Sequence, residues 1–224
     1  SYLFRHVENT HIWGRLGNIN QLTDQGTRNL YCDVRVGSYR FDQVTEGGLE
    51  DNDSEGETFE LVEMPVGNDT DALKYHVWKL TDARYREAVR HYLRKRSEHI
   101  TYRDPNDGLP SFCRAAPQAH ERLSSLPGVD ALAWRDFVIR ASRLIKTHPR
   151  VKNSWVDLRV RDVTRLFVNS EGSRLIDRQR ICELGCELWL LNPRGEGVRT
   201  RLNHVVPEIA GLPSLRTFLA QIGA

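Results

Sequence analysis

The sequence contains two stretches of similar design, and this internal repeat constrains the fold more than any single motif. Each stretch alternates apolar and polar residues around a short turn that contains glycine, residues 23–26 in the first and residues 170–173 in the second. Such alternation is typical of half-buried strands. The expected strands are residues 2–8, 11–22 and 30–36 in the first stretch, and residues 154–161, 163–169 and 181–191 in the second. We therefore expect two three-stranded antiparallel β-meanders.

Helical periodicity accompanies each meander. Apolar residues three to four positions apart predict a long helix over residues 69–98, a second helix over residues 131–147 and a short helix after Pro213. The expected apolar stripe of the long helix comprises Leu73, Val77, Leu80, Tyr85, Val89, Tyr92 and Leu93. After residue 196 the chain is expected to form a loop until Pro213. Helices segregated from strands in this way indicate an α+β fold rather than a doubly wound sheet.

A stretch rich in proline and glycine divides the chain. Residues 101–129 contain four of the nine prolines, and such residues break regular structure. We expect residues 1–100 to hold the first meander and the long helix, and residues 101–129 to be a linker or long loop. Residues 130–224 would hold a helix, the second meander and the C-terminal helix, and the two halves together would form one domain.

Charge is balanced overall but clustered locally. The 32 Lys and Arg residues against 30 Asp and Glu residues give a net charge of +2, which favours neither nucleic acid nor a membrane as a partner. Residues 46–63 carry eight acidic residues and no Lys or Arg, and their spacing does not fit a calcium loop, so we expect a solvated loop. The second half of the long helix is basic; a solvated face is the commoner reason, with nucleic-acid binding as the weaker alternative.

Cysteine usage and hydropathy bear on the compartment. No apolar run approaches the roughly 18–20 residues that span a bilayer, so no membrane association is expected. The four cysteines are scattered, which is not a disulfide framework and favours a reducing compartment, the cytoplasm. Cys182 and Cys186 lie on one face of an expected strand, too far apart at ~3.3 Å per residue to share a metal ion. We expect both to be buried as small apolar side chains.

No catalytic motif stands out. His120-Glu121 is the only His-Glu pair ahead of a possible helix, but no second histidine follows at the spacing of a zinc protease. A serine nucleophile motif and a glycine-rich phosphate loop are both absent from the sequence. The residues themselves therefore predict no catalytic, cofactor-binding or metal-binding side chain in this chain.

Two short motifs carry a resemblance to a known family. The first is Leu30–Asp42 (LYCDVRVGSYRFD) and the second is Arg165–Arg174 (RLFVNSEGSR), with the long helix between them. Together they resemble the TldD/PmbA family of zinc metallopeptidases, in a divergent branch, and the resemblance runs from residue 2 to about residue 200. It implies the α+β fold of that family's N-terminal domain, in a cytoplasmic protein that works in dimers.

The resemblance also implies where catalysis resides. The family's zinc site, an H-E-x-x-x-H helix with a later cysteine, belongs to a C-terminal domain, and no residue of this sequence matches it. The implied role is a non-catalytic domain that supports dimer assembly and presents an extended peptide to that zinc site. The implied partners are the family's C-terminal catalytic domain or a related subunit, and an unfolded peptide substrate. Because the family's leading helix and zinc motif have no counterpart here, we expect these residues to be part of a larger enzyme.

An extended peptide can bind a sheet by adding a strand to a free edge, where main-chain hydrogen bonds give affinity without regard to sequence. Residues 11–22 and residues 163–169 are the candidate edges, with Leu166 and Val168 as the candidate docking residues on the second. Two alternatives remain. The chain could be a stand-alone interaction subunit without protease activity, and nucleic-acid binding is a weak third interpretation.

Overall fold

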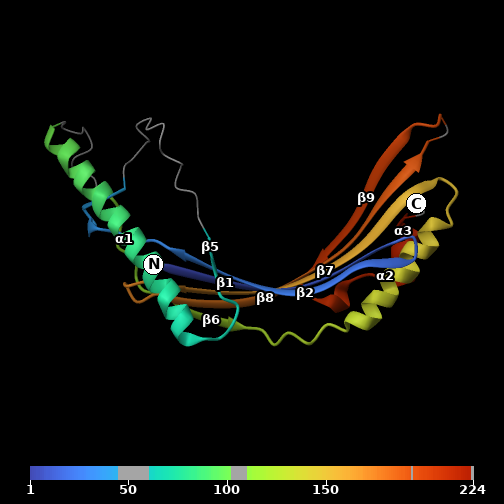
Figure 1. Cartoon of the computed structure of the whole chain (residues 1–224), viewed down its shortest axis with the longest axis horizontal. Helices are drawn as coiled ribbons and strands as arrows, with labels where there is room; N and C mark the ends of the chain where they lie inside the picture. The colour runs from blue at the N-terminus through green and yellow to red at the C-terminus, as the bar shows by residue number, and fades with distance from the viewer. Residues whose placement is uncertain (45–60, 102–109, 193, 223–224) are drawn as a thin grey trace. The chain divides into compact units, whose positions relative to one another are not determined.

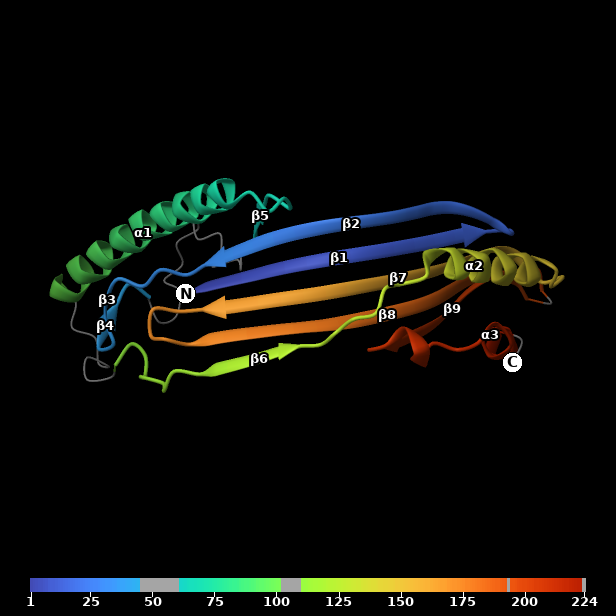
Figure 2. The same cartoon turned by 90° about the horizontal axis from the view of Figure 1, so that it is seen from below.

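The computed structural model describes residues 1–44, 61–101, 110–192 and 194–222, and its core element is a seven-stranded sheet. Strands run in the order β5-β2-β1-β7-β8-β6, and β9 also pairs with β8 (Figure 2). The sheet strands are β1 (Tyr2–Arg15), β2 (Asn18–Cys32), β5 (Val62–Met64), β6 (Ala119–Leu123), β7 (Val151–Val168), β8 (Arg174–Leu191) and β9 (Gly197–Val206). The helices labelled in Figure 1 are α1 (Thr70–Thr101), α2 (Ala131–Lys146) and α3 (Leu215–Ile222), and a 3-10 turn, η1, spans Ile209–Gly211. The predicted α+β class is confirmed.

The first hairpin turns earlier than the sequence pattern predicts. Residues 2–8 and the start of the expected second strand form one strand, β1, and the turn lies at Leu16 and Gly17, which have φ values of 56° and 85°. The predicted turn at residues 23–26 is wrong, because this segment stays extended within β2. The buried Ser142 hydroxyl of α2 accepts a 3.0 Å hydrogen bond from the Gly17 amide, which holds the observed turn in place.

The second hairpin follows the prediction more closely. The turn at residues 170–173 is confirmed, with Gly172 at φ 97° and the Asn169 side chain accepting from the Ser173 amide at 2.8 Å. The expected break between residues 161 and 163 is wrong, since β7 continues through it, and residues 174–191 form one strand. The loop expected after residue 196 is also wrong: Gly197–Val206 is β9, antiparallel to β8.

The strand expected at residues 30–36 is shorter than predicted. Strand β2 ends at Cys32, and a two-stranded hairpin follows, β3 (Gly37–Ser38) with β4 (Phe41–Asp42). Most of the acidic segment, residues 45–60, lies outside the described residues, while its last members reach β5, where Glu63 faces Asn29 of β2.

The chain divides into two compact units, and each unit draws residues from both sides of the proline-rich stretch. The first unit comprises Ser1–Arg5, Arg28–Glu121 and Arg165–Ile176, and the second comprises His6–Thr27, Arg122–Thr164 and Asp177–Ala224. Strands β1, β2, β6, β7 and β8 contribute residues to both units. Residues 101–129 were expected to form a linker or long loop, but their described part contains the strand β6.

The core of the second unit forms where α2 and α3 pack on the strands. Asp130 caps α2 by accepting from the Ala133 amide, and Phe218 of α3 is fully buried. The inward side chains are Ile12, Val138, Ala141, Ile145, Val156, Leu158, Val160, Cys182, Leu184, Cys186 and Leu188. Both predicted helices and the burial of Cys182 and Cys186 are confirmed.

The long helix α1 belongs to the first unit and begins after Asp69, whose carboxylate accepts from the amides of Asp71 and Ala72. Its predicted extent is confirmed, but its predicted apolar stripe divides between two faces. Leu73, Val77 and Leu80 are partly buried, whereas Tyr85 and Leu93 are more than half exposed. None of the helices among the described residues combines the length and apolar composition of a membrane-spanning helix.

Candidate functional site

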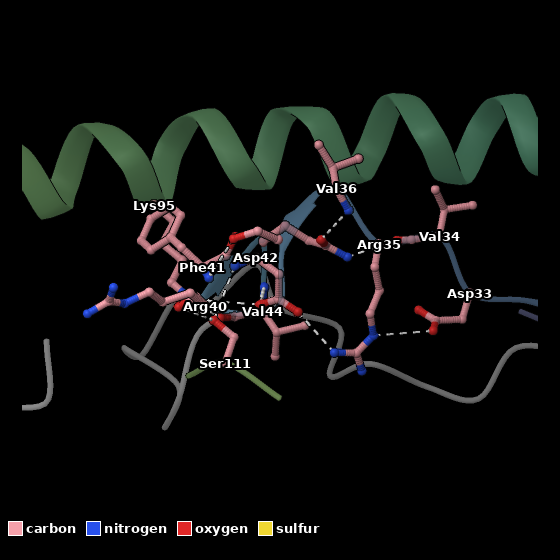
Figure 3. A network of polar contacts seen from close by, with 12 residues as sticks. Asp33, Val34, Arg35, Val36, Arg40, Phe41, Asp42, Val44, Lys95 and Ser111 are labelled. Carbon is pink, nitrogen blue, oxygen red and sulfur yellow. Dashed lines mark hydrogen bonds and ion pairs between the residues drawn. The ribbon is translucent and has the colours of Figure 1, made fainter. Parts of the chain in front are cut away.

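The first family-like motif folds around a buried carboxylate. Asp42 is 1% exposed, and Arg35 donates to its Oδ2 at 2.9 Å while the Val44 amide donates to its Oδ1 at 3.0 Å (Figure 3). The Lys95 ammonium lies 3.9 Å away, and the Ser111 hydroxyl accepts from the Asp42 amide at 3.1 Å. A buried carboxylate needs such partners because its desolvation is costly. Asp42 therefore organises the β3-β4 hairpin.

The neighbouring Gln43 fixes the approach to this hairpin. Its amide nitrogen donates to the Val34 carbonyl at 2.8 Å, and its amide oxygen accepts from the Val36 amide at 2.7 Å. Gly37 has φ 118°, and a Cβ there would collide with the carbonyl oxygen of Phe41. The glycine of this motif is thus required by the backbone conformation and by the close approach of β4.

Helix α1 holds the hairpin from the other side. The Phe41 ring meets the Tyr92 ring edge to face at 5.7 Å, and the Lys95 ammonium lies 5.0 Å from the Phe41 centroid. Lys95 also donates to the Val44 carbonyl. The first motif and the long helix therefore pack against each other.

The two family-like motifs meet in the first unit. The Tyr39 hydroxyl, from the first motif, donates to the Glu171 carboxylate, from the second. The Tyr39 ring packs on Phe112 at 4.7 Å and under the Arg114 guanidinium at 4.7 Å, and Arg35 lies 4.9 Å from the Phe112 centroid. The hydrogen bond to Glu171 raises the pKa of Tyr39 above its usual value. We call these five residues the motif junction.

The motif junction offers recognition chemistry rather than a nucleophile. Its side chains are two arginines, two aromatic rings and one carboxylate that already accepts a hydrogen bond. Within the described residues, no group of three or more His, Cys, Asp or Glu side chains is placed to hold a metal ion, so the zinc implied by the family resemblance has no fitting donor set here. Burial raises the pKa of Cys32, Cys182 and Cys186, which opposes formation of a thiolate.

The candidate docking edge at Leu166 and Val168 is not an edge. Both residues lie in β7, and the strand order places β7 between β1 and β8. The sequence pattern predicts β7 as a strand, but one of its two neighbours, β1, comes from a distant part of the chain. A peptide therefore has no open side of β7 to join.

The other candidate, residues 11–22, contains part of a free edge. Strand β1 is interior, but β2 pairs with β5 only at Arg28–Leu30. Within the described part of the chain, no strand lies beyond Asn18–Thr27, which we call the β2 edge. Almost all of its side chains are exposed, and Leu22 is 45% exposed.

Strand β9 forms the opposite edge of the second unit, and it is better protected. It carries Arg199 and Arg201, and charged side chains discourage pairing with a further strand. His204 also contacts α3, through Gln221 at 2.9 Å and through the Phe218 ring. The β2 edge has neither Lys, Arg nor Pro over ten residues, and its only charge is Asp24. Of the two, the β2 edge is the more open to strand addition.

Comparison with known proteins gives fold relatives only. No family model matches the sequence, and no curated protein matches it. Among solved structures, TM0727 of Thermotoga maritima MSB8, a candidate modulator of a DNA gyrase, matches with a TM-score of 0.53 at 10% identity, over 95% of this chain and 40% of that one.

Two further structures also match. TldE of Thermococcus kodakarensis has a TM-score of 0.45 at 7% identity, over 98% of this chain and 42% of that one. BT3649 of Bacteroides thetaiotaomicron VPI-5482, a candidate modulator of DNA gyrase, has a TM-score of 0.47 at 9% identity, over 99% of this chain and 44% of that one. The chain thus spans less than half the length of each of these proteins. It shares the fold of the corresponding part of TM0727, which confirms the fold expected from the two motifs.

Proposed function

We propose that this chain is a non-catalytic, peptide-presenting domain of a TldD/PmbA-like metallopeptidase, and that an extended peptide docks on the β2 edge. The observation that carries the proposal is the free edge of Asn18–Thr27 in a fold shared with TM0727. The catalytic zinc would be supplied by a separate part of the same polypeptide. This chain would contribute binding and orientation.

The β2 edge suits a peptide of unspecified sequence. Ten residues at ~3.3 Å each give an edge of about 33 Å, enough to pair with most of a ten-residue extended segment. Main-chain hydrogen bonds supply the affinity, so the side chains of the peptide need little complementarity. Leu22 offers one exposed apolar contact, and the Trp13 indole of the neighbouring strand donates to the Gln21 side chain at 2.9 Å.

Proline scanning of two adjacent residues tests this proposal. Successive amides of a strand point to opposite sides, so one of Leu22 and Thr23 directs its N–H to β1 and the other directs it outward. Proline removes that N–H. Of Leu22→Pro and Thr23→Pro, the variant that has lost the amide bonded to β1 should be destabilised. The variant that keeps the wild-type Tm is therefore the one that has lost the outward amide. We expect it to bind a labelled peptide of about ten alternating Thr and Val residues at least about tenfold more weakly.

Alanine variants at the same positions are the matched controls, because they shorten the side chain and keep the amide. Leu22→Ala and Thr23→Ala should retain most of the peptide affinity. Equal affinity of the folded proline variant and the wild type would refute docking at the β2 edge. Complete failure of the wild-type chain to bind the peptide would refute the presenting role altogether.

The alternative function is that of a stand-alone interaction subunit, and measurements on the natural protein can distinguish it from the enzyme domain. The intact mass of the native gene product, measured together with its zinc content, separates the two. A much larger, zinc-containing protein agrees with the enzyme domain, whereas a zinc-free protein of 25.8 kDa agrees with the interaction subunit.

A further inference from the structure

The β2 edge has two different faces. Side chains point alternately to the two sides of a strand, so one face of the β2 edge carries Leu22, Asp24 and Gly26. Leu22 is 45% exposed, and Asp24 and Gly26 are exposed as well. A peptide that pairs with this edge turns every second side chain toward these three residues. The chemistry of this face therefore decides which side chains the peptide can place there.

The register of the hairpin shows what lies behind this face. Strands β1 and β2 are its two arms, and they run antiparallel (Figure 2). Three hydrogen-bonded pairs follow one continuous register, and they are Ser1 with Asp33, Thr10 with Asp24 and Trp13 with Gln21. In that register Glu8 of β1 lies opposite Gly26. The bond from the Thr10 hydroxyl to Asp24 places Thr10, and with it Glu8 two residues before, on the face of Asp24.

Glu8 is open to a ligand at this position. Its side chain is 57% exposed, and its carboxylate lies 3.6 Å from His6 Nε2 and 3.9 Å from the Arg178 guanidinium. Exposed ion pairs at such distances contribute little, so Glu8 can accept a further cation. Gly26 has no side chain, so β2 places none between Glu8 and a peptide on the edge. We call Leu22, Asp24 and Gly26, with Glu8 behind them, the acidic face.

The charges around the acidic face leave its carboxylates available. Arg28, the next residue of β2 on this side, donates to the Pro65 and Gly67 carbonyls and to the Asn68 side chain. Its guanidinium is thus engaged by residues 65–68. On the other face of the β2 edge the side chains of β2 are uncharged, and burial and the nearby Arg159 lower the pKa of His11 behind them. Negative charge is therefore concentrated on one side of the edge.

We propose that the β2 edge selects basic extended peptides, with Lys or Arg at two alternate positions, opposite Asp24 and Gly26, and an aliphatic residue opposite Leu22. This inference rests on the proposed docking at the β2 edge and names the class of peptide that docks there. The first basic side chain meets Asp24 directly across the strands, and opposite charges in that position stabilise strand pairing. The aliphatic residue packs on Leu22 in the same way.

The second basic side chain reaches Glu8 over Gly26. Two strand spacings of ~4.8 Å place β1 about 10 Å from a docked peptide, a gap that one long side chain from each strand can span. The apolar stem of Lys or Arg lies over the bare backbone of Gly26 while its charged end meets the Glu8 carboxylate. An acidic peptide would instead oppose carboxylates to carboxylates, which weakens pairing. Main-chain hydrogen bonds still supply most of the affinity, so charge adds a preference and not a requirement.

Three labelled peptides of equal length test this preference. The first is the peptide of about ten alternating Thr and Val residues, and the other two carry Lys or Glu in place of two successive valines. Fluorescence anisotropy should show that the wild-type chain binds the Lys peptide at least about tenfold more tightly than the Glu peptide, with the Thr-Val peptide between them. This ratio should narrow at high salt, because the paired charges are exposed to solvent.

Isosteric variants assign the preference to the acidic face. The ratio of Lys-peptide to Glu-peptide affinity should fall in Asp24→Asn and in Glu8→Gln, and should fall to within about twofold in the double variant. Taking the ratio on each variant removes any general effect of the substitution on docking. Gly26→Val keeps every charge but fills the gap before Glu8, so it should lower the ratio by about twofold to fivefold. Asp136→Asn is the matched control, since this carboxylate is 64% exposed on α2, and it should leave the ratio unchanged.

The outcomes separate this inference from the docking on which it rests. Binding of the Thr-Val peptide with equal affinities for the Lys and Glu peptides would overturn the basic preference and leave docking at the β2 edge intact. A Lys preference that survives in the double variant would also overturn it, because the attraction would then come from other acidic residues. Failure of all three peptides to bind the wild-type chain would refute the docking itself, and the preference with it.

Discussion

The Tyr39 hydroxyl donates a hydrogen bond to the Glu171 carboxylate, although the two residues are 132 positions apart. This contact raises the pKa of Tyr39, chiefly because the hydrogen bond favours the protonated phenol. We expect Glu171→Gln to lower the Tyr39 pKa toward its ordinary value of about 10. The difference in absorbance titration between each protein and its Tyr39→Phe variant isolates this phenol from the other tyrosines.

The sign of the linked stability follows from the raised pKa. The contact stabilises the fold at pH values below the ordinary pKa of a tyrosine, and this contribution is lost as the pH rises through the folded-state pKa. The stability difference between wild type and Glu171→Gln should therefore be constant near neutrality and shrink above about pH 10. A difference that grows at high pH would contradict the assigned contact.

Gly14 is packed too closely for a side chain. A Cβ there would lie 2.6 Å from the Asn18 carbonyl oxygen and 2.8 Å from a Val138 methyl group of α2. We expect Gly14→Ala to lower the free energy of unfolding by about 1–3 kcal/mol, measured by urea denaturation. Gly197→Ala is the matched control, because a Cβ at Gly197 meets nothing within 4 Å. Equal stabilities of the two variants would contradict the packing.

The cysteines should react in two classes. Cys113 is exposed, while Cys32, Cys182 and Cys186 are buried, and burial raises the pKa of Cys186 to about 12. We expect a thiol reagent such as DTNB to modify Cys113 quickly in the native protein and the other three only on unfolding. The count of thiols modified before and after adding denaturant checks this. Rapid labelling of the native Cys113→Ser variant would contradict the burial of the other three thiols.

Arg180 of the second unit forms a buried ion pair with Asp162. Its side chain is 4% exposed, donates to both Asp162 carboxylate oxygens at 2.6 Å and donates to the Pro127 carbonyl at 2.6 Å. Arg180→Met leaves the Asp162 charge without a partner and should cost about 3–5 kcal/mol of stability. Asp162→Asn in the same background should recover part of this loss, which a double-mutant cycle measures. Additive losses would show that the two residues do not interact.

Local signals predicted the helices and the second hairpin because those signals lie in neighbouring residues. Asp130 and the apolar spacing that follows it are sufficient to define α2. The turn of the first hairpin was predicted at the wrong place for two reasons. Leu16, with φ 56°, is not a residue type that marks such a turn, and the stabilising Ser142 hydroxyl comes from a distant helix. Strand β9 was predicted as a loop because most of its residues are charged or polar, and only its Leu202 and Val206 pack against the core.

The docking edge and the contact between the two motifs depend on long-range pairing, which no local sequence pattern predicts. The edge prediction required knowing that β7 lies between β1 and β8, and this order is set by long-range pairing. Tyr85 and Leu93 fit the apolar spacing of the predicted stripe of α1, yet both side chains are more than half exposed. Both motifs were identified from sequence, but the contact between Tyr39 and Glu171 required the fold.

Hydrogen exchange along β2 tests the central claim most directly. In the free chain, amides that point outward between Asn18 and Thr27 have no strand partner among the described residues and should exchange quickly, while the alternate amides that bond β1 should be protected. On binding the alternating Thr-Val peptide, every second amide of this segment should become protected by at least about tenfold. Bound peptide with unchanged exchange at Asn18–Thr27 would contradict docking at the β2 edge.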